Sequence, residues 1–200
     1  MPSLQVNLQK QQNTHWCWVA VTASIAKFYN PTSHWSQSKL IEQFIRVPLY
    51  GKKVLELAKT TTGTKNRTNF PGKIEDGLRM VQCFRDRITL KSSGTYEELV
   101  LEGQQKFLLV KAEIDLNRPV VCGVRPKGST GEGHAVIIVG YESDGEIKWK
   151  EPQHPEKLRI SASFQTFMWD LEGAAYLDYM IFTKSHTTFQ NDPRYIYSHH

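Results

Sequence analysis

The chain has 200 residues, of which 40% are hydrophobic, and a formal net charge of +5. This length suits one compact domain, or two lobes that share an interface. It holds no apolar run of about 18 residues, and its Lys and Arg residues are scattered without a nucleic-acid-binding motif. We therefore predict neither a membrane nor a nucleic acid as a partner.

The composition predicts mainly helices over residues 13–84. The most apolar of these helices runs from Cys17 to Tyr29 and is expected to be buried on most sides. We expect Asn13 or Thr14 to cap its first amides. Further helices are predicted at residues 37–46 behind a Ser36 cap, at 52–59 and at 73–84 with Cys83 in the core, with a polar loop at 60–72.

The second half is predicted to be mainly extended, over residues 105–184. The run His134–Tyr141 is too apolar for a sheet edge, and the turn signal Asp144-Gly145 leads into a returning strand, Ile147–Lys150. Residues 104–114 fit either the end of a helix or a strand. The other predicted elements are strands at 88–90, 118–125 with Cys122 in the core, 158–160 and 174–182, helices at 96–101 behind Thr95 and at 163–170, and a loose tail at 185–200.

The three cysteines, Cys17, Cys83 and Cys122, are widely spaced and form no Cys-x-x-Cys motif. This pattern predicts neither a disulfide framework nor a structural metal site, and it suits a reducing compartment. Residues 1–8 lack the basic and apolar regions of a secretory signal. We expect a cytoplasmic protein, or one delivered into the cytosol of a target cell, without a cofactor.

Cys17 and His134 are the candidate catalytic pair. A free cysteine is commonly an inert core residue, but Cys17 follows a polar loop and opens a helix whose positive end favours a thiolate. His134 follows the Gly-x-Gly loop at 131–133 and opens a buried strand, so it can face a cleft from a rigid backbone. These positions suit a nucleophile and its general base.

Two further roles have two candidates each. Glu151 and Gln153 follow the strand that returns beside His134, and either side chain could orient its imidazole. The backbone amide of Cys17 and a glutamine side chain from the preceding loop, Gln11 or Gln12, could hold an oxyanion.

The order of these motifs resembles the papain-like cysteine peptidases. The motif Gln-Gln-x-x-x-Trp-Cys-Trp-x-Ala and the later Gly-His-Ala-Val are most similar to the compact bacterial branch with effector peptidases of the AvrRpt2 type (C70/C39-like). The resemblance covers about residues 10–155 and assigns the oxyanion role to Gln11. The family usually has Asn or Asp as its third group, where this sequence offers Glu151.

The resemblance implies an α+β fold in one domain over residues 1–200. A helical lobe at about 10–86 would carry Cys17, an antiparallel sheet or barrel lobe at about 87–184 would carry His134, and the substrate cleft would lie between them.

The implied function is hydrolysis of peptide bonds in protein substrates by a cysteine endopeptidase. We expect a bacterial effector or toxin, with a cognate inhibitor or immunity protein as its partner. The alternatives are an acyltransferase, cyclase or deamidase with the same residues, or a non-catalytic peptide-binding relative.

Overall fold

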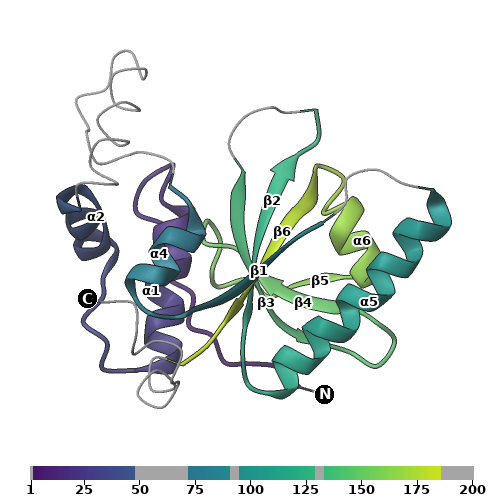
Figure 1. Cartoon of the computed structure of the whole chain (residues 1–200), viewed down its shortest axis with the longest axis horizontal. Helices are drawn as coiled ribbons and strands as arrows, with labels where there is room; N and C mark the ends of the chain where they lie inside the picture. Colours follow the sequence, from purple (N-terminus) through teal and green to yellow (C-terminus); the bar gives the residue numbers. More distant parts are fainter. Residues whose placement is uncertain (1, 48–71, 91–94, 129–132, 186–200) are drawn as a thin grey trace, which may run out of the picture.

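The computed structural model describes residues 2–47, 72–90, 95–128 and 133–185 (Figure 1). The described helices are α1 (Cys17–Tyr29), α2 (Gln37–Arg46), α4 (Ile74–Met80), α5 (Tyr96–Asp115) and α6 (Phe164–Trp169). The described strands are β1 (Phe84–Thr89), β2 (Val120–Pro126), β3 (His134–Tyr141), β4 (Ile147–Lys150), β5 (Arg159–Ser161) and β6 (Ala175–Thr183).

The strands form one antiparallel sheet in the order β1-β6-β2-β3-β4-β5. Figure 1 shows α1, α2 and α4 together on the left of the sheet and α5 and α6 on the right. Helix α1 packs on β3 as well as on α2 and α4. The predicted α+β class is therefore confirmed, and the left-hand helices meet the sheet where α1 contacts β3 and α4 contacts β1.

Helix α1 has the predicted bounds and is buried from Trp18 to Ala26. Its two polar residues in this stretch, Thr22 and Ser24, each donate a hydrogen bond to a backbone carbonyl one turn earlier, at 2.7 Å. This arrangement satisfies hydroxyl groups that would otherwise be costly to bury. The helix is thus a rigid support for the residue at its start.

Helix α2 also has its predicted bounds, and Ser36 caps it by accepting from the Lys39 amide at 3.2 Å. The helix predicted at 73–84 is too long, because α4 ends at Met80 and Gln82 has a φ of 60°. That left-handed residue redirects the chain, and Phe84 then begins β1. Cys83 lies in the core as predicted, with 1% of its surface exposed.

Helix α5 corrects the prediction for the middle of the chain. Residues 96–115 form one helix, so the expected short helix at 96–101 and the mainly extended second half are wrong here. Thr95 and Glu98 form a reciprocal capping box at its start. At its other end the buried Glu113 pairs with Arg85 at 2.7 Å and Arg118 at 2.9 Å, which ties α5 to β1.

Strands β3 and β4 have their predicted bounds, and the turn between them contains Gly145 at a φ of 96°. Four further predicted elements are confirmed with shifts at their ends: the strands at 118–125, 158–160 and 174–182 and the helix at 163–170. Cys122 is fully buried in β2, as expected. The predicted helix at 52–59, most of the loop at 60–72 and nearly all of the tail lie outside the described residues.

The segment at residues 3–8 crosses from the sheet to α1. Its backbone bridges β3 at Gly140, and Leu4 donates to the Val139 carbonyl at 2.7 Å. Further on, the Gln9 amide donates to the Ser24 hydroxyl of α1 at 2.9 Å. Leu4, Val6 and Leu8 are buried while the residues between them are exposed, as in a half-buried strand.

Candidate active site

Cys17 is the first residue of α1 and is half-buried, unlike the nine residues that follow it. The N-cap residue is Trp16, whose side chain makes no capping hydrogen bond, so the expected cap position at Asn13 or Thr14 is wrong. The backbone carbonyls of both residues instead accept hydrogen bonds from the Gln11 side chain. The positive end of the helix is therefore directed at the surroundings of Cys17.

His134 is the first residue of β3 and lies opposite Val124 of β2. The next six residues of the strand are buried, whereas a quarter of the His134 side chain is exposed. The strand thus fixes the backbone of His134, and the imidazole ring lies partly exposed at the end of the strand. Residues 129–132, which include part of the preceding Gly-x-Gly loop, lie outside the described residues.

Cys17 and His134 line the same pocket, which has a volume of about 190 Å³. Its lining also includes Arg125 and Asp178, which form an ion pair of 2.7 Å. The pocket is also lined by Trp18, Gly72, Ile74, Gly123, Val124, Gly133, Ala135 and Tyr179. The pocket therefore joins residues from α1, α4, β2, β3 and β6 around the thiol.

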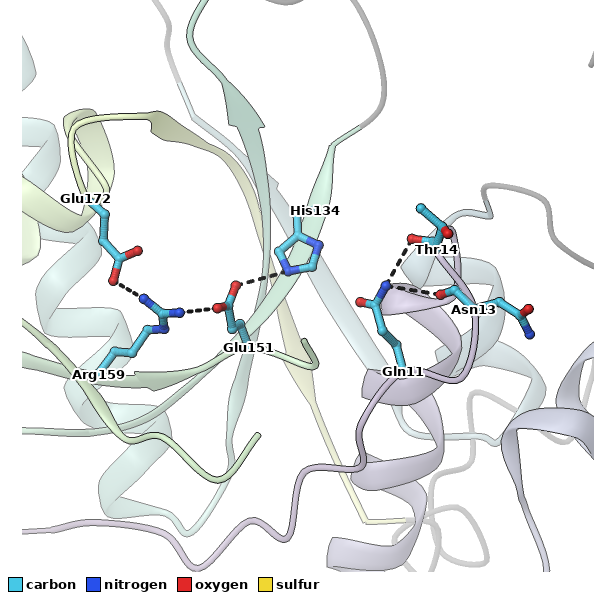
Figure 2. A network of polar contacts seen from close by, with 7 residues as sticks. All are labelled: Gln11, Asn13, Thr14, His134, Glu151, Arg159 and Glu172. Carbon is cyan, nitrogen blue, oxygen red and sulfur yellow. Dashed lines mark hydrogen bonds and ion pairs between the residues drawn. The ribbon is translucent and has the colours of Figure 1, made fainter. Parts of the chain in front are cut away.

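The imidazole of His134 interacts with both Cys17 and Glu151. Its Nε2 lies 3.4 Å from Glu151 Oε2, an ion-pair contact that is not aligned as a regular hydrogen bond (Figure 2). The other ring nitrogen, Nδ1, is therefore the one that can face the Cys17 thiol. Burial alone lowers the pKa of His134, but its interactions with Cys17 and Glu151 raise it to about 9. The imidazolium form is consequently favoured at neutral pH.

Glu151 follows β4 and divides its two oxygens between two partners. Oε2 faces His134, and Oε1 accepts from Arg159 Nη2, while Arg159 Nη1 contacts Glu172 (Figure 2). The contact with His134 lowers the pKa of Glu151, burial opposes this change, and the charge of Arg159 lowers the pKa further. Of the two candidates from the sequence, the structure brings Glu151 to the imidazole and leaves Gln153 exposed.

Gln11 is half-buried and Gln12 is exposed. The Gln11 Nε2 donates to the carbonyls of Asn13 at 3.0 Å and Thr14 at 2.9 Å (Figure 2), and its Oε1 is buried without a hydrogen-bond partner among the described residues. Exchanging the two amide atoms would set an oxygen against two carbonyls, so the hydrogen-bond pattern supports this orientation. Both amide hydrogens of Gln11 are thus used within its own loop.

The loop that carries Gln11 is held from two sides. The backbone N–H of Gln11 donates to the carbonyl of Pro152 at 2.9 Å, and Pro152 directly follows Glu151. On the other side, the buried side chain of Gln37 donates to the Lys10 carbonyl at 2.8 Å and accepts from the Gln12 amide at 3.1 Å. These bonds fix the backbone on either side of Gln11. The sequence did not predict that Gln37 supports this loop, although Gln37 directly follows the predicted helix cap Ser36.

The two remaining cysteines lie in a different environment. Cys83 and Cys122 are buried, and burial raises the pKa of each thiol, that of Cys83 to about 12. Only Cys17 among the three is partly exposed. In the part of the chain that the structure describes, no group of three or more His, Cys, Asp or Glu residues could hold a metal ion. None of the described helices is long and apolar enough to cross a membrane.

A cysteine at the start of a buried helix, facing a histidine on an antiparallel sheet, is the arrangement of the papain-like fold, and the chain has this fold. A family model described as "Peptidase_C39 like family" matches residues 3–171, so the chain belongs to this family of cysteine peptidases. No curated protein matches the chain. The narrower resemblance to the AvrRpt2-type branch stays a prediction.

Proposed function

We propose that the chain is a cysteine endopeptidase that hydrolyses peptide bonds in protein substrates through Cys17 and His134. The observation that supports this proposal most is that both side chains line one pocket, where the interaction with Cys17 raises the pKa of His134. An imidazolium beside the sulfur stabilises the thiolate, which is the nucleophilic form of cysteine.

The proposed reaction begins when the Cys17 thiolate attacks the carbonyl carbon of the substrate. His134 then donates its proton to the leaving amine, and the substrate remains bound to Cys17 as a thioester. Neutral His134 next takes a proton from water, which attacks the thioester and releases the second product. Glu151 holds Nε2 of the imidazole throughout, so that Nδ1 stays directed at the sulfur.

Two donors are proposed for the oxyanion that forms during each attack. The first is the backbone amide of Cys17, which belongs to the first turn of α1. The second is the Gln11 side chain, which would have to exchange one of its bonds to Asn13 or Thr14 for the oxyanion. This exchange is an expected step of substrate binding, because both hydrogens are occupied in the free protein.

The proposal is tested by comparing the intact protein with Cys17→Ala in a cell lysate and identifying new protein termini by mass spectrometry. Cys83→Ala is the matched control, because that cysteine lies in the core and outside the pocket. We expect internal termini with the unchanged protein and the control, and none with Cys17→Ala. Identical termini in all three samples would contradict proteolysis, and Cys17-dependent side-chain modification without new termini would instead indicate a deamidase or transferase.

We also propose, as an extension, that the peptidase is a bacterial effector or toxin acting in the cytosol of a target cell, with a cognate protein inhibitor. The three free cysteines support a reducing site of action. Expression in the cytosol of candidate target cells should impair growth only while Cys17 is present. Equal growth of cells with the unchanged protein and with Cys17→Ala would contradict this extension and leave the peptidase activity untouched.

A further inference from the structure

The side chain of Glu151 is restrained at both of its oxygens. Oε2 faces His134 at 3.4 Å and Oε1 contacts the Arg159 guanidinium, with 13% of the side chain exposed. A glutamate has several rotatable bonds, and its last torsion is loosely restricted by the chain itself. A contact with His134 alone would therefore leave the carboxylate free to swing, whereas the second contact fixes its plane.

Arg159 is itself held in place by the sheet. It is the first residue of β5 and lies opposite Trp149 of β4, with its guanidinium 5.3 Å from the centre of that ring. Trp149 is buried and donates from its indole nitrogen to Ser161 at 3.1 Å. The guanidinium therefore rests on a fixed aromatic surface, which also favours it electrostatically.

Glu172 holds the outer edge of the same guanidinium. It lies in the turn before β6 with a φ of 51°, and about half of its side chain is exposed. Figure 2 shows the four side chains in a row from Glu172 through Arg159 and Glu151 to His134. The charges alternate along this row when His134 is protonated, and each interior member contacts a neighbour on both sides.

We propose that Arg159 is a positioning residue of the active site, which holds Glu151 in the orientation that directs the His134 imidazole at Cys17. This inference rests on the proposed function. Arginine suits the role because its planar fork reaches two carboxylates in fixed geometry and it does not lose its proton in proteins. It can therefore keep Glu151 ionised and oriented without taking part in proton transfer.

The charged groups around Glu151 define what removal of Arg159 should change. Among the described residues, His134 faces it from β3 and Arg159 from β5, while the neighbouring Lys150 turns away to the Val6 carbonyl at 3.1 Å. Arg159 lowers the pKa of Glu151, so its loss should raise that pKa and move the acid limb of activity to higher pH. A less restrained Glu151 would also stabilise the imidazolium of His134 less. The pKa of His134 would then fall, and the alkaline limb of activity would move to lower pH.

The test compares Arg159→Gln, Arg159→Lys and Glu172→Gln in steady-state kinetics over a range of pH. We expect Arg159→Gln to lower kcat about tenfold, the lower end of the loss seen when partners that orient metal-bound histidines are removed, with KM little changed and a narrower pH profile. Arg159→Lys should recover part of kcat, and Glu172→Gln should have a smaller effect. Arg46→Gln is the matched control, because its ion pair with Glu42 on α2 is exposed and outside the pocket.

A double substitution separates positioning from general stabilisation. If Arg159 acts through Glu151, then Arg159→Gln should change kcat little in a protein that already carries Glu151→Gln. The inference would be overturned if Arg159→Gln lowered kcat by the same factor with and without Glu151→Gln. It would also be overturned if Arg159→Gln left the pH profile unchanged. The peptidase function would stand in both cases.

The rate of Cys17 alkylation by iodoacetamide over the same pH range provides a readout that does not require a substrate, since Cys83 and Cys122 are buried. If no Cys17-dependent cleavage is found, the proposed function fails, and the inference is still decided by this measurement. A shift of the alkylation profile with Arg159→Gln supports it, and an unchanged profile contradicts it.

Discussion

The two sides of the candidate active site are built in different ways. On the helical side, Gln11 and Cys17 come from one short stretch that leads into an apolar helix. On the sheet side, His134, Glu151 and Arg159 come from three strands or strand ends that only the register of the sheet brings together. The helical side can therefore be recognised from a local motif, whereas the sheet side depends on long-range pairing.

The largest expected effect tests whether the two sides act as one unit. Cys17→Ala and His134→Ala should each lower the rate of substrate cleavage by about 10⁴-fold or more, because each removes a member of a pair that works jointly. The double substitution should be no slower than either single one. Rates can be followed by mass spectrometry of the cleaved product, and a double variant that is much slower than both would show that the sides contribute independently.

Glu151→Gln tests the sheet side and should lower kcat by roughly 100-fold, which lies within the range for removing a group involved in acid–base catalysis. The alkaline limb of kcat/KM should lie near pH 9 in the unchanged protein, because the imidazolium of His134 loses its proton there. Glu151 raises that pKa, so the substitution should move the limb to lower pH. The exposed Gln153→Ala is the control, and an equal loss in that variant would transfer the orienting role to Gln153.

The prediction from sequence succeeds where a local signal is strong. The apolar run after Cys17 and the β-forming run after His134 gave correct bounds for α1 and β3. It fails where the tertiary structure decides, as at residues 104–114, which fit both a helix and a strand in isolation. The predicted helix was extended to Phe84, the first residue of β1, because the pairing of β1 with β6, about a hundred residues later, leaves no local signal.

The same distinction applies to the site. The sequence indicated Cys17 and His134 by their motifs and Glu151 by its position after a strand. The structure brings these three residues together. Arg159 was missed because its contact with Glu151 follows from how β5 aligns with β4, which the sequence does not state. The alternation of Leu4, Val6 and Leu8 was a readable signal of an extended, half-buried segment that the sequence analysis did not use.

Gln37 shows that the helical side also depends on contacts from outside its own stretch of the chain. Gln37→Leu should lower the free energy of unfolding by about 1–3 kcal/mol, because it leaves the Lys10 carbonyl and Gln12 amide without this partner. Denaturation with urea measures this change. Gln43→Leu, at an exposed position of the same helix, is the control and should change stability by less than about 0.5 kcal/mol. Equal losses in both variants would indicate a general effect of leucine on α2.

The smallest expected effect concerns the oxyanion donor. Gln11→Ala should lower kcat about tenfold, less than the loss of a fully preorganised donor, because the amide must first leave its loop partners. Gln12→Ala should have little effect, since that side chain is exposed. Both are measured with saturating substrate, and a larger loss from Gln12→Ala would reverse the assignment.

The extended segment at residues 3–8 has a consequence for how the protein is synthesised. Its partner on β3, Gly140, is translated more than a hundred residues later, so this contact closes a long loop, which is entropically costly until the sheet exists. During translation Cys17 emerges well before His134. The thiol therefore lacks its base on the nascent chain, and the pair can form only once the second half of the polypeptide has been made.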